Sequence, residues 1–531
     1  MLFYIGLIIF LILLIYDYKK LLHMAQQNLY NDDNRFLKWT LKDIKKFKIS
    51  FKCLLIVLIT LIIINVLKLE NNLLINLYFI ITNLIILLTK IRENKAGRVK
   101  IKFNVTARVK RLIVTNILIM LLIGLCIFKL DKNLIYLILT IYNLLLSFVI
   151  MLSIIINKPV EKCVYLSFKR KAVKKLNAMN SLKVIGITGS YGKTSSKNIL
   201  SDILNVKYNA LPSPKNFNTP YGLIITVNNH LDKFDDILIA EMGAYKIGEI
   251  QELCDLVKPK YGILTKIGTA HLEIFGSQEN IRKGKFELIE SLPSDGIGVL
   301  NADDELQVSY KLKNDCKIIW IGIDNKDADV RAKNIKTSNS GTTFDVEFKN
   351  DKKKYTFTTK LLGYANIYNI LASLALAKEF GLSVEEMKKA VLNVKSVEHR
   401  LELKPSVGNI TYIDDAYNSN PVGSKMALEV IKTMPGKRII VTPGMIELGD
   451  MSYELNKKFG TYMKDSVDEV ILVGKKITKP IQDGLKEVKF NNKNIHIVNS
   501  VDEGLELVKK LAGTKETYVL LENDLPDSYN E

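Results

Sequence analysis

The hydrophobic positions of this 531-residue chain follow two patterns, and the change between them falls near residue 157. Before it, long apolar runs alternate with charged loops, and after it short β-branched runs alternate with amphipathic stretches. The last apolar run is long enough to cross a bilayer, and flanking residues would complete the crossings of the shorter ones. We therefore expect an N-terminal α-helical membrane domain over residues 1–157. The five runs are Leu2–Tyr16, Cys53–Val66, Leu73–Leu88, Leu112–Phe128 and Leu134–Ile156.

Lysine and arginine set the expected orientation of these runs. Residues 17–52 and 90–111 carry nine Lys and Arg each, whereas residues 67–72 and 129–133 carry one and two. Loops rich in these residues stay on the cytoplasmic side. The pattern predicts a multi-pass plasma-membrane protein with five crossings, its N-terminus outside and its catalytic domains, after Asn157, in the cytoplasm.

The net charge of +20 belongs to the same region of the chain. The first 180 residues hold 28 Lys and Arg against 8 Asp and Glu, so residues 181–531 are electrically balanced. Anionic membrane lipids are the natural partner of such basic loops. The balanced part gives no electrostatic reason to bind nucleic acid, and we expect none there.

The second pattern predicts α/β domains. After a basic linker over residues 158–180, strand-like and helix-like stretches alternate, which is typical of a mostly parallel sheet covered by helices. Alternating positions over residues 328–360 predict an antiparallel excursion. The strand pattern restarts near Val397, so we expect an ATP-binding P-loop domain over residues 181–396 and a Rossmann-like domain over residues 397–531. The predicted strands include 183–188, 236–241, 261–267, 298–301, 318–322, 410–413, 438–441 and 469–474.

A glycine-rich turn follows the first of these strands. The segment reads Thr188-Gly189-Ser190-Tyr191-Gly192-Lys193-Thr194-Ser195 and opens a predicted helix. Glycines let backbone N–H groups close on phosphate oxygens, and the helix N-terminus favours negative charge. Lys193 would reach the outer phosphates and Thr194 would offer a hydroxyl ligand to Mg²⁺. The general pattern places Gly six residues before the lysine, where this chain has Ile187, so the match is to a tighter variant. The turn predicts ATP binding.

Other candidate residues have ordinary structural readings when each is taken alone. Glu241 follows an apolar strand, where a carboxylate suits Mg²⁺. His271 follows another strand and would read as a loop histidine, and Lys285 on a predicted helix as an exposed lysine. Asn366, Asn369, Arg400 and Asp415 would read as helix-start, ion-pair and turn residues.

Together, these positions resemble the Mur ligase family in order and spacing. Members of that family are ATP-dependent amide-bond ligases that build the stem peptide of peptidoglycan. The resemblance covers residues 181–531 and is strongest to the branch that adds D-alanyl-D-alanine. Its hallmarks are echoed by residues 216–222 (NFNTPYG), 241–244 (EMGA), 270–277 (AHLEIFGS), 413–421 (IDDAYNSNP) and 447–449 (ELG).

The resemblance implies a role for each candidate. Gly189, Ser190, Gly192, Lys193, Thr194 and Ser195 would hold the ATP phosphates, and Thr194 and Glu241 would ligate Mg²⁺. His271 would help to place a second Mg²⁺. Lys285 matches a lysine that the family carbamylates, so it would support a metal as an anionic carbamate. Asn366, Asn369, Arg400 and Asp415 would complete the nucleotide site. Catalytic roles would fall to Lys193, Glu241, His271 and Lys285, and substrate contacts to Asn216, Asn218, Thr219, Tyr417, Asn418 and Asn420.

Two departures from the family pattern bear on the substrate. A membrane domain stands where the family has a soluble domain that binds a UDP-sugar. Near the C-terminus a Lys-Gly-Ser-type segment is replaced by residues 521–527 (LENDLPD), whose carboxylates would suit an incoming ammonium group.

The resulting hypothesis is a membrane-anchored, ATP- and Mg²⁺-dependent ligase that forms an acyl phosphate and adds an amino acid or dipeptide to a cell-wall peptide precursor. The precursor would be a small molecule or lipid-linked, and cell-wall biosynthetic proteins are possible partners. Two alternatives remain: a membrane-bound ligase for a poly-amino-acid or other envelope polymer, and a nucleotide-responsive membrane regulator.

Overall fold

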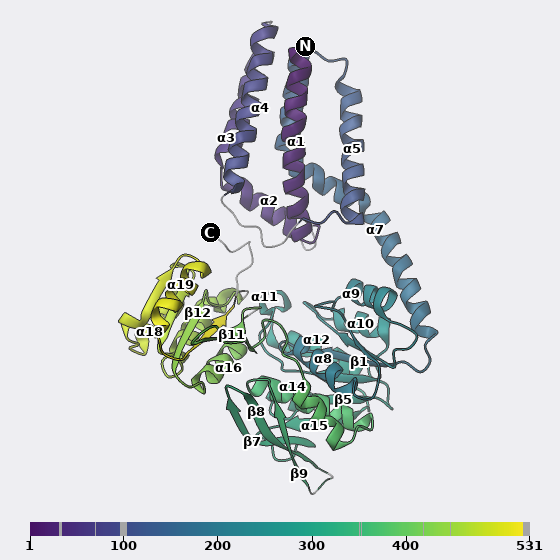
Figure 1. Cartoon of the computed structure of the whole chain (residues 1–531). Coiled ribbons are helices and arrows are strands. Elements are labelled where there is room, and N and C mark those ends of the chain that lie inside the picture. Colours follow the sequence, from purple (N-terminus) through teal and green to yellow (C-terminus); the bar gives the residue numbers. More distant parts are fainter. Residues whose placement is uncertain are drawn as a thin grey trace. The chain divides into compact units, whose positions relative to one another are not determined.

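The computed structural model describes residues 1–30, 34–69, 71–95, 103–349, 351, 353–417, 419–446 and 448–523. The chain forms two compact units, one comprising Met1–Ser167 and the other beginning at Phe168. Figure 1 shows the course of the chain through both.

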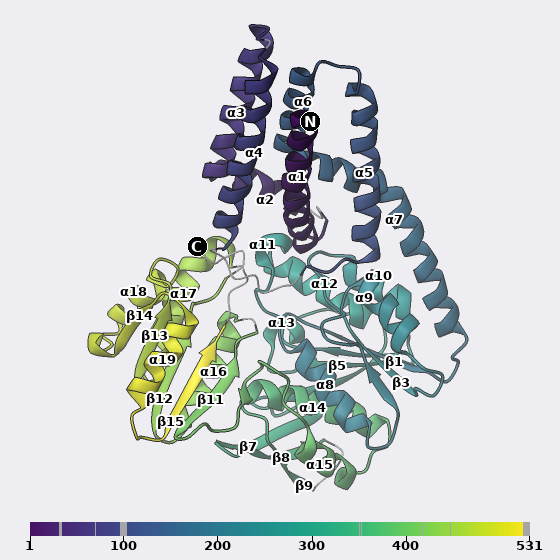
Figure 2. The ribbon, with the colours of Figure 1, turned by 45° about the horizontal axis from the view of Figure 1, so that its top comes forward.

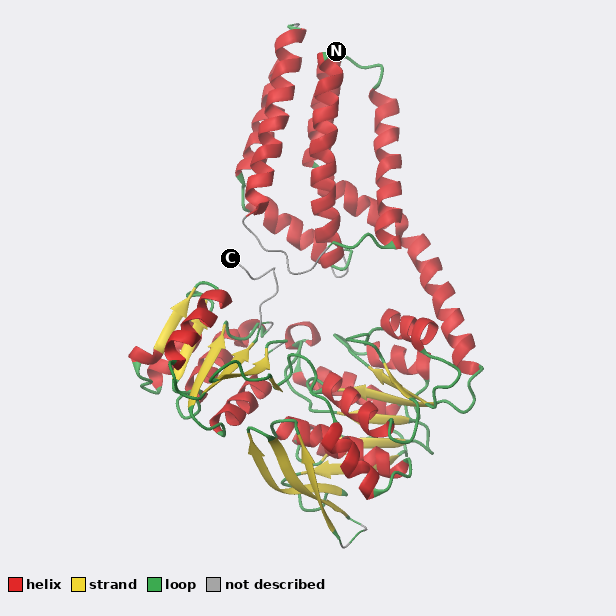
Figure 3. Cartoon of the chain, viewed as in Figure 1, coloured by secondary structure: helices red, strands yellow, loops and turns green. Residues whose placement is uncertain are grey.

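The first unit is entirely helical in its described part (Figure 3). Four of its helices are long and apolar enough to cross a membrane. They correspond to the first four apolar runs of the sequence. The helices of this unit are α1 (Leu2–Gln27), α2 (Arg35–Lys45), α3 (Ile49–Val66), α4 (Asn72–Lys95), α5 (Ala107–Ile127), α6 (Lys132–Leu144) and α7 (Leu146–Asn177).

The fifth apolar run differs from the expected single crossing. It is divided between α6 and α7, which are bent by 69° relative to each other, so a fifth span exists only if the bent pair counts as one. The break falls at Leu145, where one helix ends and the Phe148 N–H starts a new turn by donating to the Leu145 carbonyl at 2.8 Å. Hydropathy is continuous across the break and therefore did not reveal it. Helix α7 also continues through most of the predicted linker, to Asn177.

The second unit contains a nine-stranded sheet in the order β2-β3-β1-β4-β5-β6-β7-β8-β9. Pairing is parallel from β2 to β7 and antiparallel from β7 to β9, which confirms the predicted antiparallel excursion. The strands are β1 (Lys183–Thr188), β2 (Ala210–Pro212), β3 (Ile237–Glu241), β4 (Tyr261–Leu264), β5 (Ile297–Asn301), β6 (Lys317–Gly322), β7 (Val330–Ser338), β8 (Gly341–Phe348) and β9 (Lys354–Thr359).

Helices cover both faces of this sheet. On one face, α8, α14 and α15 share a buried apolar core with the central strands. On the other face α12 packs so closely that a Cβ at Gly186 would lie 2.5 Å from Leu288 Cδ1. The helices of this domain are α8 (Lys193–Leu204), α9 (Pro220–Ile225), α10 (Glu249–Val257), α11 (Leu272–Phe275), α12 (Gln278–Glu290), α13 (Glu305–Val308), α14 (Tyr364–Glu379) and α15 (Val384–Asn393).

A six-stranded sheet follows, in the order β10-β11-β15-β12-β13-β14 (Figure 2). Its core lies between the sheet and α16, α17 and α18 on one face and α19 on the other. The elements are β10 (Glu402–Leu403), β11 (Ile410–Asp415), α16 (Pro421–Lys432), β12 (Lys437–Thr442), α17 (Ser452–Tyr462), β13 (Glu469–Val473), α18 (Lys479–Glu487), β14 (Ile495–Val498), α19 (Val501–Ala512) and β15 (Thr517–Glu522).

Candidate nucleotide and metal site

The glycine-rich turn lies between the end of β1 and the start of α8, as its sequence predicts. Gly189 has a φ of 147° and Gly192 a φ of 83°, conformations that side chains disfavour. A Cβ at Gly189 would lie only 1.9 Å from Thr265 Oγ1. The Thr265 hydroxyl donates to the Tyr191 carbonyl at 2.6 Å, and the Gly268 N–H donates to Ser190 Oγ at 3.0 Å. The segment after β4 therefore holds the turn in place.

Lys193 folds back over this turn. Its Nζ donates to the Gly189 carbonyl at 2.6 Å and to the Ser190 carbonyl at 3.3 Å. Desolvation lowers the pKa of Lys193 to about 8, and the Glu241 charge opposes that shift. An ammonium group held over N–H groups of a helix start is suited to phosphate oxygens.

Glu241 ends β3 beside the turn and is almost fully buried. Its Oε1 accepts hydrogen bonds from Thr194 Oγ1 at 3.2 Å and Asn218 Nδ2 at 3.1 Å. The hydroxyl and the carboxylate that the sequence assigned to Mg²⁺ are thus adjacent, and both are oxygen donors of the kind this ion prefers.

The same carboxylate has a partner that sequence reasoning missed. Lys197 Nζ lies 3.0 Å from Glu241 Oε2. Lys197 follows Lys193 by four residues, so both lie on one face of α8. That spacing was the available signal.

Lys285 is buried on α12 rather than exposed. Its Nζ donates to the Ala244 carbonyl at 3.2 Å and lies 5.5 Å from the centre of the Phe275 ring. Desolvation, and secondarily the Lys193 charge, lower the pKa of Lys285 to about 7. A large fraction of this amine is therefore neutral at physiological pH, which is the form that can react with CO₂.

His271 begins α11 in a left-handed conformation, with a φ of 59°. Its ring centre lies 4.5 Å from that of Tyr245. Among the described residues, no group of three or more His, Cys, Asp and Glu side chains could hold a metal. Thr194 and Glu241 are the two oxygen donors that the structure brings together beside the turn, at 3.2 Å.

Two asparagines at the start of α14 face the turn differently. Asn369 Oδ1 accepts from Ser196 Oγ at 2.8 Å and would lie 3.1 Å from a Cβ at Gly192. Asn369 therefore ties α14 to the beginning of α8. Asn366 Nδ2 instead donates to the Leu362 carbonyl at 2.9 Å within its own helix start.

The residues predicted to contact the substrates have different surroundings. Thr219 and Asn420 cap helices: their side-chain oxygens accept from the N–H groups of Gly222 at 3.2 Å and Gly423 at 2.8 Å. Asn216 is exposed, and its carbonyl accepts from the Asn218 N–H at 2.8 Å. Asn418 lies outside the described residues, as does Glu447 of the 447–449 motif.

Arg400 and Asp415 belong to a second charged cluster. The Arg400 guanidinium lies 4.4 Å from the centre of the Tyr417 ring, and its charge contributes to lowering the pKa of Lys193. Asp415 ends β11 in register with Glu522 at the end of β15. Burial raises the pKa of Asp415 to about 6 and that of Glu522 well above its usual range, and the Asp415 charge raises the pKa of Glu522 further.

Glu522 departs from the expectation of an acidic patch open to an ammonium group. It is fully buried, and its Oε1 accepts from Ser419 Oγ at 2.5 Å. The register of β15 places this side chain inside the domain, so it binds its own neighbours. The other two acids of that segment, Asp524 and Asp527, lie outside the described residues.

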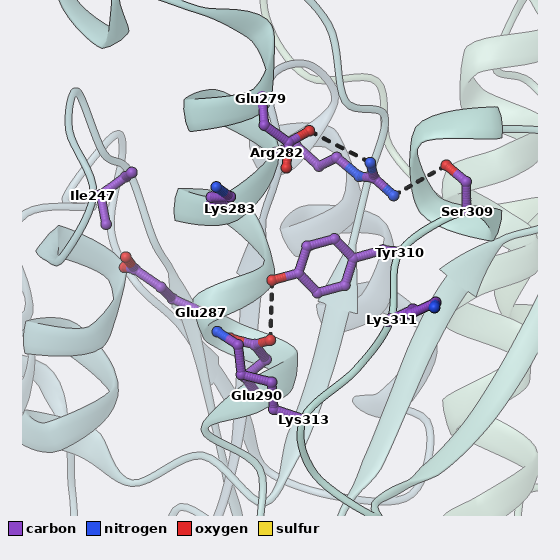
Figure 4. A pocket seen from close by; sticks show the side chains of 10 residues that line it. All are labelled: Ile247, Glu279, Arg282, Lys283, Glu287, Glu290, Ser309, Tyr310, Lys311 and Lys313. Atoms are coloured by element: carbon purple, nitrogen blue, oxygen red, sulfur yellow. Dashed lines mark hydrogen bonds and ion pairs between the residues drawn. The ribbon is translucent and has the colours of Figure 1, made fainter.

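A separate pocket of about 370 Å³ lies along α12 (Figure 4). Several of its charged side chains have partners within the pocket: Arg282 lies 3.4 Å from Glu279, and Lys313 lies 3.1 Å from Glu290. Arg282 also donates to Ser309 Oγ at 3.0 Å, and Tyr310 donates to Glu290 at 2.9 Å. The guanidinium of Arg282 also lies 5.1 Å from the centre of the Tyr310 ring. None of the predicted site residues lines this pocket.

Fold and site together define an α/β protein with a phosphate-binding loop at the end of a parallel strand, followed by a second α/β domain. Residues 187–377 match the Mur ligase middle domain and residues 399–521 match the Mur ligase, glutamate ligase domain. A UDP-N-acetylmuramoyl-tripeptide–D-alanyl-D-alanine ligase from Buchnera aphidicola is 30% identical over 341 residues, covering 64% of this chain and 71% of the relative. The chain belongs to the Mur ligase family.

Other relatives carry the same name over a shorter share of their length. The enzymes from Bacillus subtilis and Escherichia coli are each 32% identical, over 55% of this chain. The chain spans 63% and 65% of their lengths, slightly under two thirds. Among solved structures, a MurF ligase from Thermotoga maritima in complex with ADP has a TM-score of 0.61 and 26% identity, covering 68% of this chain and 80% of that one.

Proposed function

We propose that this protein is an ATP-dependent amide ligase of the Mur type. A substrate carboxylate would attack the γ-phosphorus of ATP, forming an acyl phosphate and releasing ADP. An amine would then attack the acyl carbon and displace phosphate, leaving an amide. The main support is the junction of Lys193, Thr194 and Glu241 at the ends of β1 and β3.

The chain's own residues would divide the work. Lys193 and the N–H groups of the turn would hold the phosphates and stabilise charge on the oxygens during transfer. Thr194 and Glu241 would hold Mg²⁺, which supplies further charge stabilisation when bound. Asn366 and Asn369 would approach the nucleotide from α14, and Arg400 and Asp415 from the C-terminal domain.

Lys285 and His271 would support the same centre. The depressed pKa of Lys285 favours the neutral amine, whose attack on CO₂ releases a proton and leaves an anionic carbamate. A carbamate can hold a cation, whereas an ammonium group would repel it. His271, at the start of the neighbouring helix α11, would help to place a second metal ion.

The substrates we propose follow the relatives. Their name specifies a UDP-N-acetylmuramoyl-tripeptide and D-alanyl-D-alanine. We propose a cell-wall peptide precursor of this type as the carboxylate, and an amino acid or dipeptide as the amine. Asn216, Asn218 and Thr219 would contact the former, and Tyr417, Asn418 and Asn420 the latter.

We also propose that the N-terminal helices place the ligase at the plasma membrane. Their hydropathy and length support crossing, and the basic loops support a cytoplasmic position for residues after Asn157. The boundaries 1–157, 158–180, 181–396 and 397–531 remain our division of the chain into membrane domain, linker, central domain and C-terminal domain. At the membrane the ligase would meet lipid-linked precursors and other cell-wall enzymes.

The test is ligation by the purified full-length protein in detergent, with ATP, Mg²⁺, UDP-N-acetylmuramoyl-tripeptide and D-alanyl-D-alanine. We expect equal amounts of ADP and of a pentapeptide product identified by mass spectrometry. The variant Lys193→Ala should lose this ligation. Its matched control is Lys207→Ala, which alters an exposed lysine bonded to the Gly381 carbonyl and should keep the activity.

Two other outcomes would replace the proposal. Release of ADP that depends on glutamate or another amino acid, without any muropeptide, would favour a ligase for an envelope polymer. Nucleotide binding without any ligation would favour a regulator.

A further inference from the structure

Lys197 is a charged residue at the centre of the site that the proposed chemistry does not use. It lies on α8, one turn after Lys193, and is 1% exposed. A lysine is rarely buried to this extent unless it is paired, since its charge loses the stabilisation of water.

The Lys197 ammonium group joins two segments of the chain. Its Nζ lies 3.0 Å from Glu241 Oε2 at the end of β3, and it also donates to the Lys215 carbonyl. Residues 213–219, which we call the acceptor loop, include Lys215 and the proposed substrate residues Asn216 and Asn218.

The acceptor loop is attached to the same strand end by further bonds. Asn218 Nδ2 donates to Glu241 Oε1 at 3.1 Å, the Glu241 N–H donates to Ser213 Oγ at 3.1 Å, and the Gly243 N–H donates to the Asn218 carbonyl at 2.8 Å. The Glu241 carboxylate therefore lies between the loop and α8, and Lys197 compensates its charge at one oxygen.

Lys197 also divides the two oxygens of this carboxylate by role. Oε2 lies 3.0 Å from the ammonium group and accepts no hydrogen bond among the described residues, whereas Oε1 accepts a hydrogen bond from Thr194 Oγ1 at 3.2 Å. Oε1 is therefore the oxygen that lies beside the hydroxyl of the phosphate-binding turn, where a cation would be shared.

We propose that Lys197 is a positioning residue that fixes the Glu241 carboxylate with Oε1 toward Thr194 and, through the Lys215 carbonyl, holds the acceptor loop against it. The nucleotide side and the acceptor side of the site are thereby built on one buried ion pair. The inference rests on the proposed function for the identity of the acceptor, but the contacts it invokes exist without any ligand.

The experiment compares Lys197→Met with Lys175→Met. Lys175 also donates to a backbone carbonyl, that of Leu231, but has no carboxylate partner among the described contacts, so it controls for losing a lysine–carbonyl bond. Hydrogen exchange of residues 213–219 is measured without ligands. ADP affinity is measured in EDTA, and the KM of the tripeptide acceptor is measured with Mg²⁺.

We expect Lys197→Met to speed exchange in the acceptor loop and to raise the acceptor KM by about tenfold or more, a change as large as the loss of metal affinity or activity that follows removal of a group supporting a metal ligand. ADP affinity in EDTA should change less than about threefold, because the turn and Lys193 remain. Lys175→Met should leave all three unchanged. Slow exchange and an unchanged acceptor KM in Lys197→Met would overturn the proposal, as would equal losses in both variants.

A double variant covers the case in which Lys197→Met does not fold. In Lys197→Met with Glu241→Gln, the charge is removed along with its partner, and the Gln oxygen can still accept from Thr194 and Asn218. We expect folding to return, because the uncompensated buried charge is gone, while exchange in the acceptor loop stays faster than in the wild type, because the Lys215 carbonyl still lacks its donor. Wild-type exchange rates in the double variant would contradict the role assigned to Lys197. The hydrogen-exchange and ADP-affinity measurements need no turnover, so a failure of the ligase assignment would appear separately, as wild-type protein that joins no substrates.

Discussion

The central and C-terminal domains concentrate charge at the same place in their sheets but with opposite sign. At the ends of β1 and β3, Lys193 and Lys197 gather around the Glu241 carboxylate. At the ends of β11 and β15 lie two carboxyl groups, those of Asp415 and Glu522. The Arg400 charge acts to lower the pKa of both.

The two clusters respond differently to burial. In the central domain desolvation lowers the pKa of Lys193 to about 8, so its ammonium group loses a proton more readily than that of an exposed lysine. In the C-terminal domain it raises the pKa of both acids, that of Asp415 to about 6, so they retain a proton to a higher pH than exposed carboxyl groups do. The carboxyl ends of parallel strands thus concentrate ionisable groups in both sheets.

The largest effect should come from the basic cluster. Lys193→Ala removes the cation above the phosphate-binding turn, and we expect product formation to fall about 10³-fold, since stabilisation of transferring charge is lost. Steady-state release of ADP with both substrates measures it. Retention of more than a tenth of the wild-type rate would contradict the assignment of this turn.

Carbamylation of Lys285 is a second test of the charged groups in the central domain. Because the pKa of Lys285 is lowered to about 7, the reactive neutral amine increases as pH rises through 7 and is scarce at pH 6. With ¹³C-bicarbonate, NMR should show a carbamate signal at pH 8 that weakens strongly at pH 6. The signal should be missing from Lys285→Ala, whose activity should fall by about 10²-fold. A signal that persists in that variant would assign the adduct to another amine.

Glu522→Gln tests the acidic cluster through stability. A carboxyl group whose pKa is raised in the folded state binds more protons there than in the unfolded chain, so stability falls as pH rises through that range. For Asp415 the window runs from about 4 to about 6. Glutamine keeps the shape and the Ser419 contact but removes one titrating acid.

The loss of unfolding free energy between pH 5 and pH 7.5 should therefore be smaller in Glu522→Gln, by on the order of 1 to 3 kcal/mol. Urea unfolding of both proteins at the two pH values measures the difference. Identical pH dependence in the two proteins would show that Glu522 titrates normally.

Asn369→Ala should have the smallest effect. It removes the acceptor of the Ser196 hydroxyl bond between α14 and α8, at a cost of about 1 kcal/mol of stability. We expect ATP affinity to fall by about three- to tenfold, because the beginning of α8 is less well held. Calorimetric titration with a non-hydrolysable ATP analogue checks this, and an unchanged affinity would limit Asn369 to packing.

Sequence patterns predicted the parallel strands well because each central strand is an apolar run bounded by turn residues. β1 was predicted with its observed bounds, and β3, β5 and β6 to within a residue at each end. The bend at Leu145 was missed because both sides of it are equally apolar. The β15 strand was also missed, although it lies between β11 and β12 in the sheet.

The position of the phosphate-binding turn could be predicted from its motif, because its backbone requires glycine at positions 189 and 192. Residues whose importance depends on three-dimensional burial were harder to recognise. The four-residue spacing from Lys193 is the one local sign that sets Lys197 apart from an exposed helical lysine. The pairing of Glu522 with Asp415 depends on the register of two strands, at positions 107 residues apart in sequence. Sequence predicted which residues would gather at the turn, whereas the electrostatic balance around them required the fold.

The close approach of Thr265 to Gly189 has an evolutionary consequence. No side chain fits at position 189, because a Cβ atom there would collide with the Thr265 hydroxyl. The φ of 147° at this position also disfavours every residue except glycine. Serine at position 265 would keep that hydroxyl, so a conservative exchange there would not open the space. Related proteins that retain this glycine-rich turn should consequently keep glycine at position 189, even where their substrates differ.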